Sequence, residues 1–162
     1  MNGSELHAAH VEVCARVVDV YAYRMQSSAP EVLLLHRSQN VSYAGTWRMV
    51  GGKIETDETA WQAALRELDE ETGLTPERFW AVPSLNRFYE WRHDRINLIP
   101  AFAARVSGAP ALNNEHDTAA WWPIEEAAGQ LQWPEQQRLV RLIGQMLSAG
   151  IPASLVIPPE EW

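Results

Sequence analysis

Hydrophobic residues gather in segments rich in β-branched and aromatic side chains, which is typical of strands. Such segments cover residues 11–23, 31–36, 79–91, 96–106 and 118–122, and a short extended piece covers 47–50. Residues 59–72 and 134–148 instead have helical periodicity, with Gly73 and Gly150 placed to end the two helices. Because strands and helices interleave without a regular βαβ repeat, the pattern predicts an α/β fold, with a mixed β-sheet sandwiched between helices.

Length and composition predict a single domain over residues 1–162. Hydrophobic residues make up 46% of the chain, enough for a core, and no apolar run is long enough to predict a membrane span. Residues 1–10 lack the basic start and apolar run of a signal peptide. Cys14 is the single cysteine and cannot form an internal disulfide, so we expect a cytoplasmic protein and leave a homodimer open.

The net charge of −8, with histidines neutral, argues against a nucleic-acid partner, because such binding depends on neutralising phosphates. The same charge disfavours a polyphosphate substrate unless divalent cations accompany it. One segment of the chain is suited to hold such cations.

Three glutamates of the 59–72 helix fall on one helical face. With about 100° per residue counted from Glu67, Glu70 lies near roughly 300° and Glu71 near roughly 40°. The same side otherwise carries alanines that would leave room for ions and substrate: Ala60, Ala63 and Ala64. The residues expected to face the core are Trp61, Leu65 and Leu68.

Two interpretations of this acidic face stay open. Most acidic helical faces are solvated, although like charges at this spacing repel by a few tenths of a kcal/mol per pair. Carboxylates converging on one spot are also what Mg²⁺ needs, since it takes oxygen ligands. Gly51 and Gly52 lie just upstream and are expected to form a tight turn that brings backbone groups close to the glutamates, which favours the metal site.

The segment from residue 52 to 74 resembles the Nudix box: Gly, five residues, Glu, seven residues, Arg-Glu, an aliphatic residue, any residue, Glu-Glu, any residue, Gly and an aliphatic residue. All fixed positions match, at Gly52, Glu58, Arg66, Glu67, Leu68, Glu70, Glu71, Gly73 and Leu74. Residues 45–53 also resemble the family's approach to the box, with Val50 where proline is common. The chain is thus similar to MutT-like Nudix hydrolases, especially the branch acting on dATP or dihydroneopterin triphosphate.

The resemblance implies roles for the matching positions. Divalent metal, Mg²⁺ with Mn²⁺ able to substitute, would be bound by the glutamates and one carbonyl: Gly51, Glu67, Glu70 and Glu71. Glu67 and Glu70 would also be catalytic. Arg66 would orient the glutamates through charge-assisted hydrogen bonds, in a network that includes Glu58.

Nudix enzymes often use a further carboxylate from a downstream loop, as catalytic base or metal ligand. Glu115 is the candidate here, because it lies in a polar segment just before the last predicted strand. The alternative, that Glu115 is a surface turn residue, stays open. Its neighbour His116 is expected to be structural.

Four residues are candidates for substrate binding: Arg37, Trp47, Arg48 and Lys53. Arginine can clamp a phosphate with two hydrogen bonds, lysine attracts it as a point charge, and tryptophan can stack on a base. Further candidates for a phosphate clamp are Arg87, Arg92 and Arg95, and for stacking Tyr89 and Trp91. Each has a plain alternative, since most such cations are solvated and many aromatic side chains belong to the core.

The residues and the resemblance together predict a Mg²⁺-dependent pyrophosphohydrolase of a small-molecule nucleotide, namely a (d)NTP such as dATP or a related pterin triphosphate. The alternatives are a dinucleoside polyphosphate hydrolase and a non-catalytic Nudix module that senses a nucleotide, against which the intact box argues. An isoprenoid diphosphate isomerase would need a catalytic cysteine, whereas Cys14 looks structural. RNA decapping fits poorly with the net charge.

Overall fold

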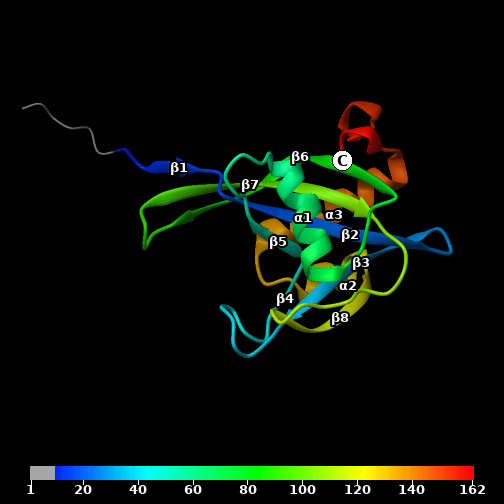
Figure 1. Cartoon of the computed structure of the whole chain (residues 1–162), viewed down its shortest axis with the longest axis horizontal. Coiled ribbons are helices and arrows are strands. Elements are labelled where there is room, and N and C mark those ends of the chain that lie inside the picture. The colour runs from blue at the N-terminus through cyan, green and yellow to red at the C-terminus, as the bar shows by residue number, and fades with distance from the viewer. Residues whose placement is uncertain (1–9) are drawn as a thin grey trace, which may run out of the picture.

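The computed structural model describes residues 10–162. Residues 1–9, which belong to the segment without signal-peptide features, lie outside the described residues. An eight-stranded mixed sheet is covered by α1 on one face and by α2 and α3 on the other (Figure 1). This arrangement confirms the predicted α/β fold with helices on both sides of the sheet. Across residues 10–162, no helix combines the length and hydrophobicity that a bilayer span needs.

The strands are β1 (Glu12–Cys14), β2 (Val17–Gln26), β3 (Ala29–Arg37), β4 (Trp47–Arg48), β5 (Val50–Lys53), β6 (Arg78–Glu90), β7 (Arg95–Arg105) and β8 (His116–Pro123). The helices are α1 (Ala60–Thr72), α2 (Ile124–Gln130) and α3 (Pro134–Ala149), followed by the short 3₁₀ turns η1 (Ala153–Leu155) and η2 (Pro159–Glu161). The main sheet path is β1-β7-β2-β3-β4, with β5 paired to β2, β6 to β7 and β8 to β3. The pairs of β7 with β1 and with β2 are parallel, and the others are antiparallel.

The long strand predicted at 11–23 is divided into β1 and β2, which is one correction to the sequence analysis. Cys14 pairs with Asn97, and Asp19 pairs with Ala101. Asp19 is five residues after Cys14, whereas Ala101 is only four residues after Asn97 on β7. One extra residue must therefore be accommodated between β1 and β2, as in a β-bulge. The bulge lets β1 stay beside β7 where the β6–β7 ribbon extends beyond the helices (Figure 1).

Helix α2 was not predicted, because it has only seven residues and too few turns to give a periodic signal. It begins directly after β8 and buries Ala127 and Ala128 against the sheet. Helix α3 agrees with the prediction, since Pro134 stands at its start and Leu139 and Ile143 are fully buried.

Helix α1 begins and ends as predicted. Thr59 accepts a hydrogen bond from the Gln62 backbone N–H in a capping box, and Gly73 ends the helix in the left-handed conformation at φ 66°. These caps fix where α1 begins and ends, and its packing against the sheet sets the direction in which the glutamates point.

The buried face of α1 differs from the predicted one. Ala63 and Ala64 have no exposed surface and pack in the core with Leu68, whereas Trp61 and Leu65 are only half-buried. The alanines therefore leave no room for ions or substrate. Their small side chains let α1 lie close to the sheet, which buries part of the carboxylate face as well.

This packing predicts that Ala64→Leu destabilises the protein. A larger side chain at a fully buried site forces neighbours apart, which costs about 1–3 kcal/mol and lowers Tm by about 2–4 °C per kcal/mol. Thermal unfolding measures the effect, with the half-buried Ala60→Leu as the matched control. An Ala64→Leu variant as stable as the wild type would show that the alanine face does have free space.

Candidate active site

Strand β5 passes so close to α1 and β2 that neither of its glycines could carry a side chain. A Cβ on Gly52 would overlap the carboxylate of Glu67, and one on Gly51 would lie 2.5 Å from the carbonyl oxygen of Val18. The predicted tight turn is wrong, because both glycines lie within a strand. The predicted closeness of this backbone to the acidic face is present, and it arises from strand-to-helix packing.

Arg66 connects the approach loop to the glutamates of α1. Its Nη2 and Nε donate to the Glu58 carboxylate at 2.6 and 3.1 Å, and Nη2 also donates to the Lys53 carbonyl at 2.8 Å. Its Nη1 donates to Glu67 at 2.9 Å and to Glu70 at 3.2 Å. These hydrogen bonds lower the pKa of the Glu58 carboxyl and raise that of the Arg66 guanidinium. Arg66 therefore has the geometry of an orienting residue.

Glu71 is a buried carboxylate without full compensation. Only 3% of the residue is exposed, and its Oε2 has no hydrogen-bond partner among the described residues. Burial raises the pKa of Glu71 to about 8; Arg48 lowers it, and the charges of Glu67 and Glu115 raise it further. Burial also raises the pKa of Glu67, against the opposing effect of Arg66. Since an unpaired buried carboxylate is costly, an incoming cation would relieve that cost here.

The glutamates share a helical face without converging on one point. Within residues 10–162, no three His, Cys, Asp or Glu side chains lie close enough to form a ready-made metal cage. Glu70 is directed to Arg66, and 52% of its side chain is exposed. A cation held by all three glutamates would therefore have to replace part of the Arg66 contact.

The loop before β8 brings Glu115 to the same site. Its carboxylate lies 3.4 Å from Nη1 of Arg37, and its charge raises the pKa of both Glu67 and Glu71. Its side chain is 52% exposed, as expected for a group that could exchange protons with solvent. His116 is buried, and burial lowers its pKa to about 4, so it is neutral at physiological pH.

The four substrate-binding candidates occupy different positions. Arg48 is half-buried, and its charge partly offsets the rise in pKa that burial causes at Asp19 and Glu71. Trp47 packs on the core and against the ring of Trp122, with centroids 5.9 Å apart. Arg37 donates from Nη1 to the Glu115 carboxylate at 3.4 Å. Lys53 is exposed at the end of β5 and makes no ion pair within residues 10–162.

Sequence reasoning missed a polar cluster on the sheet face opposite α1. Asp19 is 3% exposed and accepts a hydrogen bond from Asn86 Nδ2 at 3.1 Å, and burial raises its pKa. The neighbouring Tyr21 hydroxyl is buried and has no partner among the described residues. A lone aspartate between Val18 and Val20 in an apolar strand was the available signal.

Comparison with known proteins decides the family. A NUDIX domain model matches residues 15–143. The chain belongs to the Nudix family. It is 33% identical over 106 residues to the CTP pyrophosphohydrolase of Escherichia coli, covering 64% of this chain and 73% of that protein. It is 38% identical over 80 residues to the 8-oxo-dGTP diphosphatase of the same organism, covering 49% of this chain and 60% of that protein.

The fold agrees with this membership. A crystal structure of a Caenorhabditis elegans Ap4A hydrolase complex superposes with a TM-score of 0.70, at 21% identity, over 85% of this chain and 100% of that one. At this identity the likeness concerns the fold alone. The family match and the two bacterial relatives identify the chain as a MutT-like Nudix hydrolase acting on phosphorus-containing anhydrides.

The raised pKa of Glu71 predicts how the metal-free Nudix domain responds to pH. Its folded pKa of about 8 lies above the ordinary value of 4.5, so the unfolded chain loses this proton first. The stability contributed by the protonated carboxyl is complete below about pH 4.5 and is lost as the pH rises through about 8. In EDTA, Tm should therefore fall less between about pH 5 and about pH 8 in Glu71→Gln than in the wild type.

The control for this comparison is Glu126→Gln, at an exposed position of α2. Its Tm should follow the wild type at every pH. Parallel curves for Glu71→Gln and the wild type would contradict the assignment of this titration to Glu71.

Proposed function

We propose that this chain is a Mg²⁺-dependent pyrophosphohydrolase of nucleoside triphosphates, with dATP or a related pterin triphosphate as the first candidates. The observation that carries the proposal is the buried Glu71 carboxylate, whose Oε2 has no hydrogen-bond partner within residues 10–162, beside Glu67 and the Gly51–Gly52 strand. The bacterial relatives support the substrate class, since their names specify CTP and 8-oxo-dGTP.

The residues present fit a hard divalent cation. Mg²⁺ takes oxygen ligands, and the site offers carboxylates and a backbone carbonyl: Gly51, Glu67, Glu70, Glu71 and Glu115. When bound, Mg²⁺ or Mn²⁺ would neutralise phosphate charge and activate water for attack on phosphorus.

The protein's own residues would position the reactants. Arg66 holds Glu67 and Glu70, so the two carboxylates stay oriented between turnovers. Glu115 is exposed and lies at the site, which suits a group that accepts the proton of the attacking water. Arg37, Arg48 and Lys53 would attract the phosphates. Trp47 packs against the core, so it would support Arg48 rather than stack on a base.

A nucleotide panel tests the proposal. Purified protein is assayed for pyrophosphate release from dATP, CTP and 8-oxo-dGTP with Mg²⁺, and then with excess EDTA. Turnover of at least one triphosphate should stop in EDTA and return with Mg²⁺ or Mn²⁺. Full turnover in EDTA would show that hydrolysis does not depend on a divalent metal. Tight nucleotide binding without any turnover would support the sensing module instead.

Glu70→Gln separates a metal ligand from a structural residue. Glu70 is half exposed and its contact to Arg66 is a surface ion pair, so its loss should change Tm in EDTA by little. With Mg²⁺ the lost carboxylate should reduce kcat by about 10²-fold or more, by weakening the metal site. A variant that unfolds in EDTA would show Glu70 to be structural, and one with undiminished turnover would show that it is not a functional ligand.

A further inference from the structure

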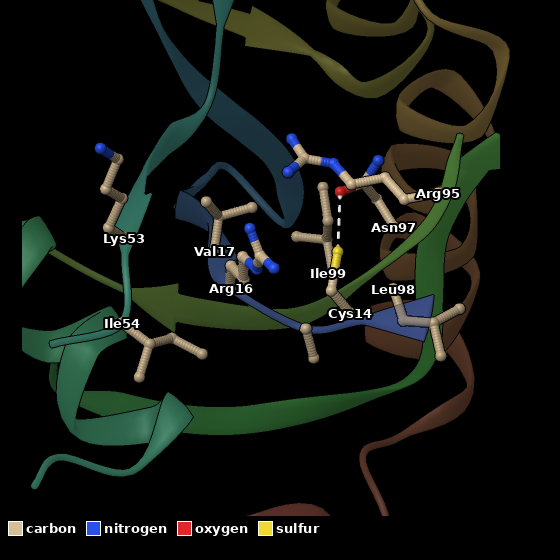
Figure 2. A pocket seen from close by; sticks show the side chains of 10 residues that line it. Cys14, Arg16, Val17, Lys53, Ile54, Arg95, Asn97, Leu98 and Ile99 are labelled. Carbon is tan, nitrogen blue, oxygen red and sulfur yellow. Dashed lines mark hydrogen bonds between the residues drawn. The ribbon is translucent and has the colours of Figure 1, made fainter. Parts of the chain in front are cut away.

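A pocket of about 550 Å³ opens beside the end of β5 (Figure 2). Its walls come from β1, the link to β2, residues 53–54 and the first half of β7. Three cationic residues line it, namely Arg16, Lys53 and Arg95, and no carboxylate does. The chain has a net charge of −8, so the positive charge of this lining is opposite in sign to that of the whole protein.

The two arginines are held by carboxylates that lie outside the lining. Arg95 donates from Nε to Glu90 at 2.6 Å, and Arg16 donates from Nη2 to Glu12. Both terminal nitrogens of Arg95 are thereby left without a hydrogen-bond acceptor in the described part of the chain. Figure 2 shows both guanidinium groups turned toward the same opening. Held in this way, an arginine can offer its remaining donors to an anion with little further loss of entropy.

Lys53 connects this pocket to the acidic site. Its side chain lines the pocket, and its carbonyl accepts the 2.8 Å hydrogen bond from Arg66. The preceding residue, Gly52, lies against the carboxylate of Glu67. The cationic pocket therefore starts one residue away from the glutamates to which we assign metal binding.

The two sides of the acidic site differ in chemistry. The pocket lining has no aromatic ring, so it offers no surface on which a base could stack. The other side, around Arg48, has the Asp19–Asn86 pair and the Tyr21 hydroxyl, all of which are buried and not open to a ligand. A lining with three cations and no aromatic ring therefore suits phosphates rather than a base.

We propose that the pocket of Arg16, Lys53 and Arg95 is a subsite for the phosphate-rich leaving half of the substrate, which is the pyrophosphate end of a nucleoside triphosphate. The inference rests on the proposed function, because it orients the substrate across the same acidic site. The triphosphate runs from the acidic face along Lys53 toward Arg95, and the nucleoside lies on the far side of the acidic face from this pocket.

Product inhibition of Arg95→Gln tests this orientation, since each product reports on one half of the substrate. Inorganic pyrophosphate should inhibit the wild type as a product. In Arg95→Gln its inhibition constant should rise about 10-fold, as expected for losing a charge-assisted hydrogen bond. Inhibition by the nucleoside monophosphate should be unchanged.

Arg105→Gln is the matched control. Arg105 stands at the other end of β7, outside the pocket, and also forms an ion pair, with Glu77 at 3.6 Å. The same charge is removed from the same strand, so both inhibition constants should stay at the wild-type values. If the inhibition constant of pyrophosphate rose equally in Arg105→Gln, the effect of Arg95→Gln would come from net charge alone, and the assignment would be overturned.

Equilibrium titration of the protein with inorganic pyrophosphate, in the presence of Mg²⁺, keeps the inference separate from the proposed function. Binding should weaken about 10-fold in Arg95→Gln even if no triphosphate in the panel is hydrolysed. Arg16→Gln, at an exposed position, repeats the test should the first variant fail to fold. Unchanged pyrophosphate binding in the folded variants would overturn the proposal. So would an equal loss of inhibition by both products.

Discussion

The close packing of β5 against α1 is the constraint on which the site depends. Gly52 must be glycine because the Glu67 carboxylate occupies the space of its Cβ, and the alanines of α1 must be small for the helix to reach that position. The same closeness puts Glu71 into the protein interior. The features that make the helix pack well therefore also make its carboxylates costly without a cation.

Arg66 reduces that cost for only part of the acidic face. Its guanidinium compensates Glu58 and Glu67 directly and reaches Glu70 at the surface. Glu71 receives no such contact, and the net effect of its surroundings leaves its pKa at about 8. The site is thus divided into a part that Arg66 holds, which keeps its shape without metal, and a less compensated part around Glu71, where a cation gains most. Since both parts belong to one helix, metal affinity and fold stability are coupled through α1.

The sequence predicted the fold class, both long helices and most strands, because their patterns are local. It also predicted that Glu67, Glu70 and Glu71 share a face, which follows from helical periodicity alone. Periodicity could not show that this face is partly buried, since hydrophobicity pointed to Trp61 and Leu65 instead. The burial comes from β5, which is contributed by a different part of the chain.

Glycines and isolated polar residues were misjudged for a related reason. Gly51 and Gly52 suggested a turn, whereas the space they leave is required by neighbours distant in sequence. The partner of Asp19 is Asn86, 67 positions away, so no local pattern could pair them. Lys53 likewise gains its significance from Arg16 and Arg95. Arg16 lies beside it through the pairing of β2 with β5, and Arg95 is brought to the same pocket by the parallel pairing of β1 with β7.

The distribution of charge explains how an acidic chain can accept an anionic substrate. A net charge of −8 repels polyphosphate at long range, and the strongest repulsion comes from carboxylates held close together. At Glu71 burial raises the pKa to about 8, which reduces the negative charge that the metal-free site presents at neutral pH. Beyond Lys53 the pocket lining carries three cations, and the carboxylates that pair with its two arginines lie outside that lining. An approaching phosphate chain would therefore meet cations on one side and carboxylates that a divalent ion can neutralise on the other, so that metal and substrate are expected to enter together.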